Sequence, residues 1–238
     1  MTITVYWGFS DGTSPLEMGH SSMYWQSKPE PLVKNLPDWW KDSIIRKCPA
    51  TNDPMKNTYV LRFYHPYEID INGEVISAPH GNQKTYDNFI DPRHLPNVLQ
   101  ILNWYTFFAD KPLMMEQMHP YWHSNDFTSK ATVVRGEYDI GKWFRPLNTA
   151  AVINNQNCNI KFNHKDISSY VRFHTDEKIV LKEFRYNTKI ADMVCHGTLT
   201  QGANFFGGPT QLKDLYERFK YRNSRKIILD MIRDNLVE

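Results

Sequence analysis

The sequence predicts an α+β protein with a predominantly antiparallel β core, jelly-roll-like or β-clip-like, and a C-terminal helical segment. The 238 residues are 41% hydrophobic and 14% aromatic, which suits a globular core built from sheets. Short segments rich in β-branched and aromatic residues recur between turn-forming stretches. Helical spacing of apolar residues begins only near the end of the chain. We therefore expect a β-rich main domain over residues 1–208 and a helical segment, 209–238, packed on it.

The first part of the chain predicts a strand followed by a proline-rich segment. Residues 3–9, ITVYWGF, have the composition of a strand. Three prolines follow in SKPEPLVKNLPDWWKDS, and a helix tolerates proline only in its first turn. This segment predicts a loop and then one short helix over residues 37–47. The helix would bury one face formed by Trp39, Trp40, Ile44 and Ile45.

The clearest local pattern is a hairpin. Residues 59–63 predict one strand, and residues 67–71 and 74–77 predict two more. Asn72-Gly73 lies between the last two strands. Asn-Gly favours a tight hairpin turn because both turn residues need a positive φ.

The middle of the chain predicts a series of strands. Residues 98–110, VLQILNWYTFFAD, are too short to cross a bilayer, and their aromatic residues favour a buried strand. Shorter strands follow at regular intervals over residues 131–140, 148–155, 158–162, 168–175 and 178–186. This spacing favours a sandwich, jelly roll or small barrel over alternating β-α units. From Thr210, a plausible N-cap, the spacing becomes helical.

Composition restricts the function classes. The net charge of +2 is too small to indicate nucleic-acid binding by the whole chain. The three cysteines are far apart and form no CxxC pair, so we expect neither a disulfide scaffold nor a zinc ribbon. The N-terminus has no signal-peptide pattern, and no apolar run is long enough to span a membrane. The sequence thus predicts a soluble intracellular protein that does not contact membranes.

Three segments carry a resemblance to a known family. They are KCPATNDPMKNTYVLR (47–62), GEYDIGKWFRPLNTAAVI (136–153) and YVRFHTDEKIVLKEF (170–184). They resemble an uncharacterised protein family of tailed phages that infect marine cyanobacteria. The resemblance implies a phage origin and a location in the host-cell cytoplasm or the virion. It implies no activity.

A second likeness concerns the dUTPase-type β-clip. The segment from Gly136 to Ile153, with the strands that follow, resembles the late strands of that fold. The turn His164-Lys165-Asp166 stands where the family has a Gly-Asp turn, and no early Ala-Gly-x-Asp-Leu motif is present. The likeness implies a nucleotide-binding protein. An aromatic-flanked arginine stacks on a base or clamps a phosphate in such sites, although the same pattern also forms core plugs. The candidate ligand-binding residues are Asp139, Lys142, Trp143 and Arg145.

The stretch HPYWHSND contains a candidate metal site formed by His119, His123 and Asp126. Imidazole and carboxylate are ligands of zinc and of non-heme iron. Two histidines four residues apart meet one metal when they share a helix face. The intervening residues are weak helix formers, so an aromatic, polar loop is the competing and favoured interpretation.

A second candidate metal pair is His174 and Asp176. Residues two apart on a strand share one face, and this HxD spacing occurs in iron and 2-oxoglutarate-dependent oxygenases. Such a site needs a distal histidine, and His196 is only 22 residues downstream. The simpler interpretation is a turn that links two strands.

A basic run near the C-terminus is a candidate surface for nucleic acid or a protein partner. Aromatic residues alternate with its cations, a pattern that can follow a nucleic-acid backbone, but the acidic end of the chain weakens it. Its members are Arg218, Lys220, Arg222, Arg225 and Lys226.

We expect a non-enzymatic phage accessory or structural protein that acts through protein partners or self-association and needs no cofactor. The alternatives are a metal-dependent oxygenase or hydrolase, which would use a divalent metal such as iron or zinc, and a nucleotide-binding clip-fold protein. No nucleophile motif of the GxSxG type is present.

Overall fold

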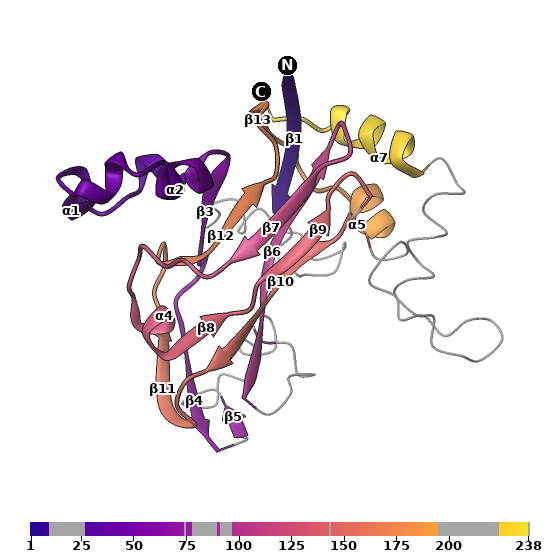
Figure 1. Cartoon of the computed structure of the whole chain (residues 1–238). Helices are drawn as coiled ribbons and strands as arrows, with labels where there is room; N and C mark the ends of the chain where they lie inside the picture. Colours follow the sequence, from indigo (N-terminus) through magenta and orange to yellow (C-terminus); the bar gives the residue numbers. More distant parts are fainter. Residues whose placement is uncertain are drawn as a thin grey trace.

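Two facing layers of β-strands form the body of the protein (Figure 1). The computed structural model describes residues 1–9, 27–73, 75–77, 90, 97–142, 144–194 and 224–237. The first layer is a five-stranded sheet, in spatial order β13 (Lys178–Glu183), β1 (Thr2–Phe9), β6 (Val98–Ala109), β10 (Pro146–Ile153) and β8 (Ala131–Val133). Within it, β1 and β13 are parallel and the other neighbours are antiparallel.

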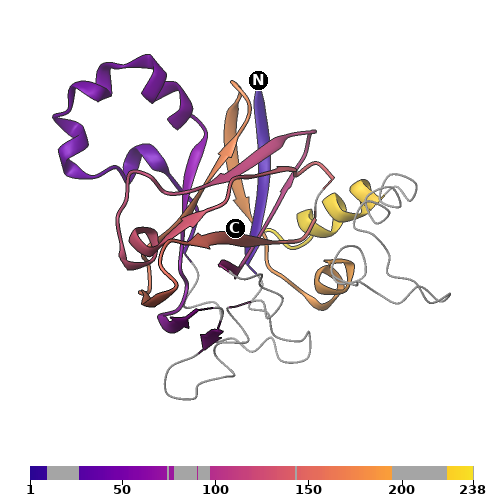
Figure 2. The same ribbon diagram turned by 60° about the horizontal axis from the view of Figure 1, so that its bottom comes forward.

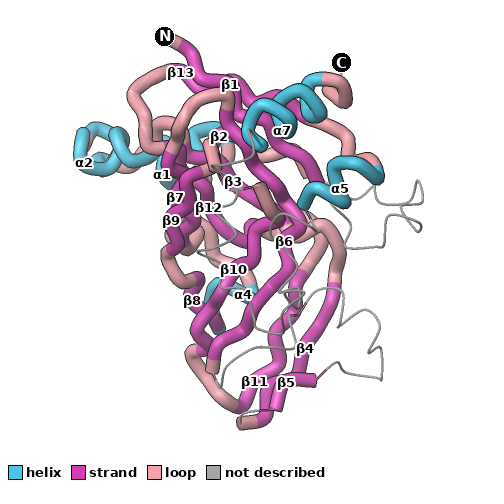
Figure 3. Tube along the Cα trace, turned by 90° about the vertical axis from the view of Figure 1, so that its right-hand side faces the viewer, coloured by secondary structure: helices cyan, strands magenta, loops and turns pink. Residues whose placement is uncertain are grey.

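The second layer contains two antiparallel sheets. The larger has the order β2 (Glu30–Pro31), β3 (Thr58–Arg62), β12 (Ile167–Phe173), β7 (Met114–Met118) and β9 (Gly136–Asp139). The smaller has the order β11 (Asn157–Phe162), β4 (Tyr67–Asn72) and β5 (Val75–Ser77). Figures 1 and 3 show the smaller sheet at one end of the body and both chain termini at the other.

The space between the layers holds two hydrophobic clusters that share strand β6. Its side chains alternate, so that every second residue faces the opposite layer. Leu99 and Ile101 join the cluster over the smaller sheet, while Tyr105 and Phe107 join the cluster over the larger one. Between these two groups, Trp104 adopts a positive φ of 56° and the pairing of β6 with β10 shifts register. This irregularity marks the point where one cluster gives way to the other.

A buried polar network occupies this junction. Gln117 on β7 donates a hydrogen bond to Thr149 Oγ1 on β10, at 2.7 Å, and another to Ser169 Oγ on β12, at 3.2 Å. The side-chain amide of Asn103 on β6 also donates to Thr149 Oγ1. All four residues are buried, so the network joins the two layers through hydrogen bonds in an otherwise apolar interior.

Helices cover the outer face of the first layer. Helices α5 (Thr188–Val194) and α7 (Ser224–Arg233) pack there on aromatic residues such as Phe108 and Phe184. Arg225 donates hydrogen bonds to the carbonyl oxygens of Gly141 and Ala109, at 3.0 and 3.2 Å, and so fixes the start of α7. The predicted α+β class, with a mainly antiparallel β core and a C-terminal helix, is confirmed. The predicted boundary at residue 208 lies outside the described residues.

A chain of short helical turns covers part of the outer face of the second layer. We call residues 32–55 the arch, because they run around an open curve at the side of the body (Figure 2). Its turns are η2 (Leu32–Lys34), α1 (Asp38–Lys41), η3 (Ile44–Lys47), α2 (Pro49–Asn52) and η4 (Asp53–Met55). Leu32, Trp40 and Met55 attach it to the sheet by packing on Val60 and Tyr170.

The arch corrects the predicted single helix over residues 37–47. Helix α1 ends at Lys41, and Ser43 caps a new turn by accepting a hydrogen bond from Ile45 N. Of the four side chains predicted to be buried, only Trp40 is. The predicted strand 131–140 is also two strands, because the chain crosses between the layers at residues 134–135. The predicted hairpin is confirmed, with a φ of 62° at Gly73, but Asn72 is the last residue of β4, pairs with Val75 and does not have the positive φ expected of a turn residue. Among the described residues, no helix combines the length and apolar character needed to span a membrane.

Candidate functional site

The loop that joins β7 to helix α4 (Asp126–Lys130) contains His119 and His123. Two successive turns shape it, since Tyr121 N donates to the carbonyl of His119 and His123 N donates to the carbonyl of Pro120, both at 2.9 Å. Helix α4 begins only after Asn125, whose side chain caps it by accepting from Thr128 N at 2.9 Å. The two histidines therefore precede the helix and do not share a helix face, as the favoured loop interpretation predicts.

Aromatic side chains from three parts of the chain meet at this loop. The ring of Trp122 lies 4.4 Å from Trp40 and 5.9 Å from Trp39, measured between centroids. The ring of Tyr121 lies 5.3 Å from Trp122 and 5.4 Å from Tyr170 on β12. We call these five residues the aromatic cluster. It joins the arch, the loop and the second layer into one packed unit.

His123 connects the same three parts through hydrogen bonds. Its Nε2 lies 2.5 Å from the carbonyl oxygen of Asn35, and its Nδ1 lies 2.5 Å from the hydroxyl of Tyr170. A carbonyl only accepts, so Nε2 carries the proton and Nδ1 of the neutral ring accepts from Tyr170. Burial lowers the pKa of His123, in spite of the opposing bond to Asn35, so the neutral ring is favoured. Both ring nitrogens are thus occupied by protein atoms.

His119 has one nitrogen in use. Its Nδ1 accepts a hydrogen bond from Val133 N at 3.2 Å, which places the proton of the neutral ring on Nε2. Burial also lowers the pKa of His119. No hydrogen bond from Nε2 is formed within the described part of the chain.

A pocket of about 620 Å³ opens between the arch and the loop. We call it the aromatic pocket. Pro37 and Trp39 of the arch line it together with His119, Tyr121, Trp122, His123, Ser124 and Thr128. Trp39 and Tyr121 are about half exposed, at 55% and 50%. The indole Nε1 of Trp122 is buried, and hydrogen bonding between Trp122 and the Tyr121 phenol offsets part of the rise that burial causes in the pKa of that phenol. The described residues that line it include no carboxylate, lysine or arginine, so together they are uncharged when both histidines are neutral.

The first predicted metal site is not assembled as a group of ligands. Asp126 Oδ1 lies 2.6 Å from Lys130 Nζ, and Oδ2 accepts from Lys161 N at 2.7 Å. Within the described ranges, no three His, Cys, Asp or Glu side chains come together as metal ligands. His196, the distal histidine that the sequence offers, lies outside the described residues. The metal hypothesis stays a prediction.

His174 and Asp176 lie in the connection between β12 and β13, as the turn interpretation predicts. His174 Nε2 lies 3.1 Å from Glu116 Oε2 on β7. Glu116 is buried, and its other carboxylate oxygen lies 2.5 Å from Arg135 Nε. Asp176 is exposed and is not among the partners of this carboxylate.

The remaining candidates from the sequence are dispersed. Lys142 Nζ lies 2.6 Å from Asp139 Oδ2, a local ion pair at the end of β9. Arg145 is close enough to Tyr138 for its charge to offset part of the rise that burial causes in the pKa of that phenol. Phe144, which directly precedes Arg145, is buried beneath α7, as the core-plug interpretation requires. Trp143 lies outside the described residues.

Of the basic run, only its end can be placed. Arg225 faces the sheet, where it anchors α7 to Gly141 and Ala109, and Lys226 is exposed. Arg218, Lys220 and Arg222 lie outside the described residues. The structure thus assigns a packing role to one of the predicted surface cations.

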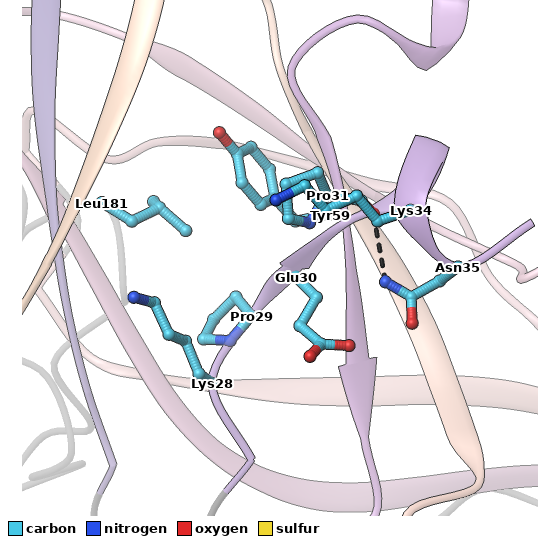
Figure 4. A pocket seen from close by; sticks show the side chains of 8 residues that line it. All are labelled: Lys28, Pro29, Glu30, Pro31, Lys34, Asn35, Tyr59 and Leu181. Atoms are coloured by element: carbon cyan, nitrogen blue, oxygen red, sulfur yellow. Dashed lines mark hydrogen bonds between the residues drawn. The ribbon is translucent and has the colours of Figure 1, made fainter.

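A second hollow, of about 470 Å³, lies where β13 and β2 form the open edges of the two layers. Figure 4 shows Lys28 and Leu181 on one side of it and Tyr59, Pro31 and Lys34 on the other. Glu30, which also lines it, pairs with Arg62 at 3.3 Å. The preceding residues, 10–26, are not described, so we assign no ligand to this hollow.

Comparison with known proteins gives no family model, no curated protein and no solved structure that matches this chain. The site must therefore be argued from its own residues. Sequence reasoning selected His119 and His123 but missed Trp39, Tyr121 and Trp122 as pocket residues. Their signal was present in the density of aromatic residues, because Trp39-Trp40 and Tyr121-Trp122 are two aromatic pairs in otherwise polar segments.

Proposed function

We propose that this protein is a non-catalytic accessory or structural protein that assembles with a second copy of itself through the arch. The supporting observation is the exposure of apolar side chains there. Ile44 is 83% exposed and Val33 is 59% exposed. Clusters of exposed large apolar residues mark interaction surfaces in soluble proteins.

The charges of the arch favour a second copy as the partner. Residues 32–55 contain four cations and three anions, and one pair, Lys41 and Asp38, is already joined at 2.7 Å. A surface that carries both signs does not repel its own copy. Apolar side chains surrounded by mixed charges are therefore compatible with a twofold contact, in which the same surface is used by both chains.

The resemblance to a phage protein family supports a proposal about where the protein acts. One of the three segments that carry it, residues 47–62, includes the end of the arch, residues 47–55. We therefore propose that the protein acts in a phage-infected host cell or in the virion. Detection of the chain by mass spectrometry in purified virions, or only in infected-cell lysate, distinguishes the two locations.

Light scattering coupled to size-exclusion chromatography tests the assembly. The wild-type chain is expected to elute as a dimer or larger species, and Ile44→Asp is expected to shift it towards the monomer. Val75→Asp is the matched control, because Val75 is also exposed, at 63%, but lies on β5 at the far end of the body (Figure 1). A monomeric wild type at all accessible concentrations, or equal effects of the two substitutions, would contradict the proposal.

A further inference from the structure

The aromatic pocket combines flat apolar surfaces with unoccupied polar groups. Trp39 of the arch and Tyr121 of the loop line it, and each is about half exposed. Ser124 is exposed, and its hydroxyl forms no hydrogen bond with a described residue. His119 is half-buried, and its Nε2 also forms none with a described residue, which is uncommon because a partly buried donor loses hydrogen bonds with water.

The charge of the pocket restricts the ligand class. No lysine or arginine is among the described residues that line it, so these residues offer no cation to hold a phosphate or carboxylate. They include no carboxylate either, so among them only the aromatic rings could balance a ligand cation. The ligand that fits is uncharged, has an apolar face to lie on a ring, and has polar groups at its edge.

We propose that the aromatic pocket binds a neutral saccharide. One face of a pyranose ring presents C–H bonds that pack on an aromatic ring, and its edge presents hydroxyls that both donate and accept hydrogen bonds. Trp39 and Tyr121 would supply the stacking faces. His119 Nε2 and the Ser124 hydroxyl would bind the sugar hydroxyls. The volume of about 620 Å³ accommodates one or two sugar rings.

The two histidines have separate tasks in this proposal. His119 offers its Nε2–H to the ligand, because Val133 N already occupies Nδ1. His123 positions the loop, because both of its nitrogens are engaged by Asn35 and Tyr170. One imidazole of the HPYWH motif thus binds the ligand, and the other positions the loop.

Saturation-transfer difference NMR on the full chain tests the inference, with maltose, cellobiose, lactose and N,N′-diacetylchitobiose as probes at millimolar concentration. An array of neutral glycans extends the panel. At least one sugar is expected to receive magnetisation from the protein and to change its tryptophan fluorescence. Trp39→Ala and Tyr121→Ala are each expected to weaken binding by about tenfold or more, which corresponds to ~1.4 kcal/mol. Ser124→Ala removes a hydroxyl without altering the aromatic surfaces and is expected to weaken binding by severalfold.

Val33→Ala is the matched control, since Val33 is an exposed apolar residue of the arch that does not line the pocket. It is expected to bind sugar as the wild type does. Ile44→Asp is expected to lose self-association and keep sugar binding, so the two proposals fail separately. Choline and adenosine are included as a cationic and a heteroaromatic probe. The inference is overturned if no neutral sugar binds, if only choline or adenosine binds, or if binding survives both Trp39→Ala and Tyr121→Ala.

Discussion

Replacing Gln117 with methionine is expected to lower the free energy of unfolding by about 1–3 kcal/mol. The two side chains have similar length and volume, so the change leaves no large cavity. It removes the two hydrogen bonds that Gln117 donates across the interior, to Thr149 Oγ1 at 2.7 Å and to Ser169 Oγ at 3.2 Å.

The consequences at the two acceptors differ. Thr149 keeps the hydrogen bond from the amide of Asn103. Ser169 is fully buried, and Gln117 is the only described residue that bonds to its hydroxyl. The substitution therefore leaves one buried hydroxyl without a partner, at a cost of about 1–3 kcal/mol, and the loss at Thr149 adds little.

A double-mutant cycle with Ser169→Ala isolates this cost. Ser169→Ala removes the hydroxyl that Gln117→Met strands, so the double substitution is expected to cost less than the sum of the two single ones. Urea unfolding of the four proteins gives each free energy and m-value. The reasoning is refuted if Gln117→Met is as stable as the wild type, or if the two costs add.

Three further outcomes are expected. The pKa values of His119 and His123 are lowered in the folded protein, so the unfolded chain binds protons more readily. Their contribution to stability is present above the unfolded value of about 6.5 and is lost as the pH falls below it; urea midpoints between pH 8 and pH 5 should fall, and less steeply in His123→Gln. Lys165→Gly should stabilise the fold by up to about 1 kcal/mol, measured by thermal unfolding, because residue 165 has a φ of 71° and glycine adopts a positive φ without strain. An unchanged stability would mean that lysine is not strained at this position. Trp40→Ala should cost about 3–5 kcal/mol in urea unfolding, and Trp39→Ala about 1 kcal/mol or less, because Trp40 is 3% exposed and Trp39 is 55% exposed; equal costs would contradict the assigned burial.

The strands could be predicted because their signal is local. The alternation along β6 and the hairpin of β4 and β5 are encoded by neighbouring residues, so the sequence alone predicts them to within a residue. The arch could not be predicted in the same way. Trp40 is buried because Val60 and Tyr170 lie beneath it, whereas the equally apolar Ile44 is left exposed. Helical spacing cannot distinguish these residues, since tertiary contacts decide which of them the sheet reaches.

The buried network escaped prediction for a related reason. Gln117, Thr149 and Ser169 are ordinary polar residues within strand patterns, and nothing in the sequence shows that all three face the interior. Their positions follow from the register of the strands, because a shift by one residue would move each side chain to the other face. Strand pairing determines the network, whose hydrogen bonds join residues as much as 52 positions apart.

The HPYWH motif shows how far spacing alone can be taken. A separation of four residues brings two histidines to one metal only on a helix, and here the helix begins after both of them, at Asp126. The loop is held instead by hydrogen bonds to residues outside the motif. His123 depends on the carbonyl of Asn35, 88 residues earlier, and on Tyr170, 47 residues later. Burial lowers its pKa, the carbonyl of Asn35 fixes the tautomer of the neutral ring, and the loop holds Trp122 against the arch with Tyr121 beside it. His123 therefore positions aromatic side chains, and these side chains form the surface that the site offers to a ligand.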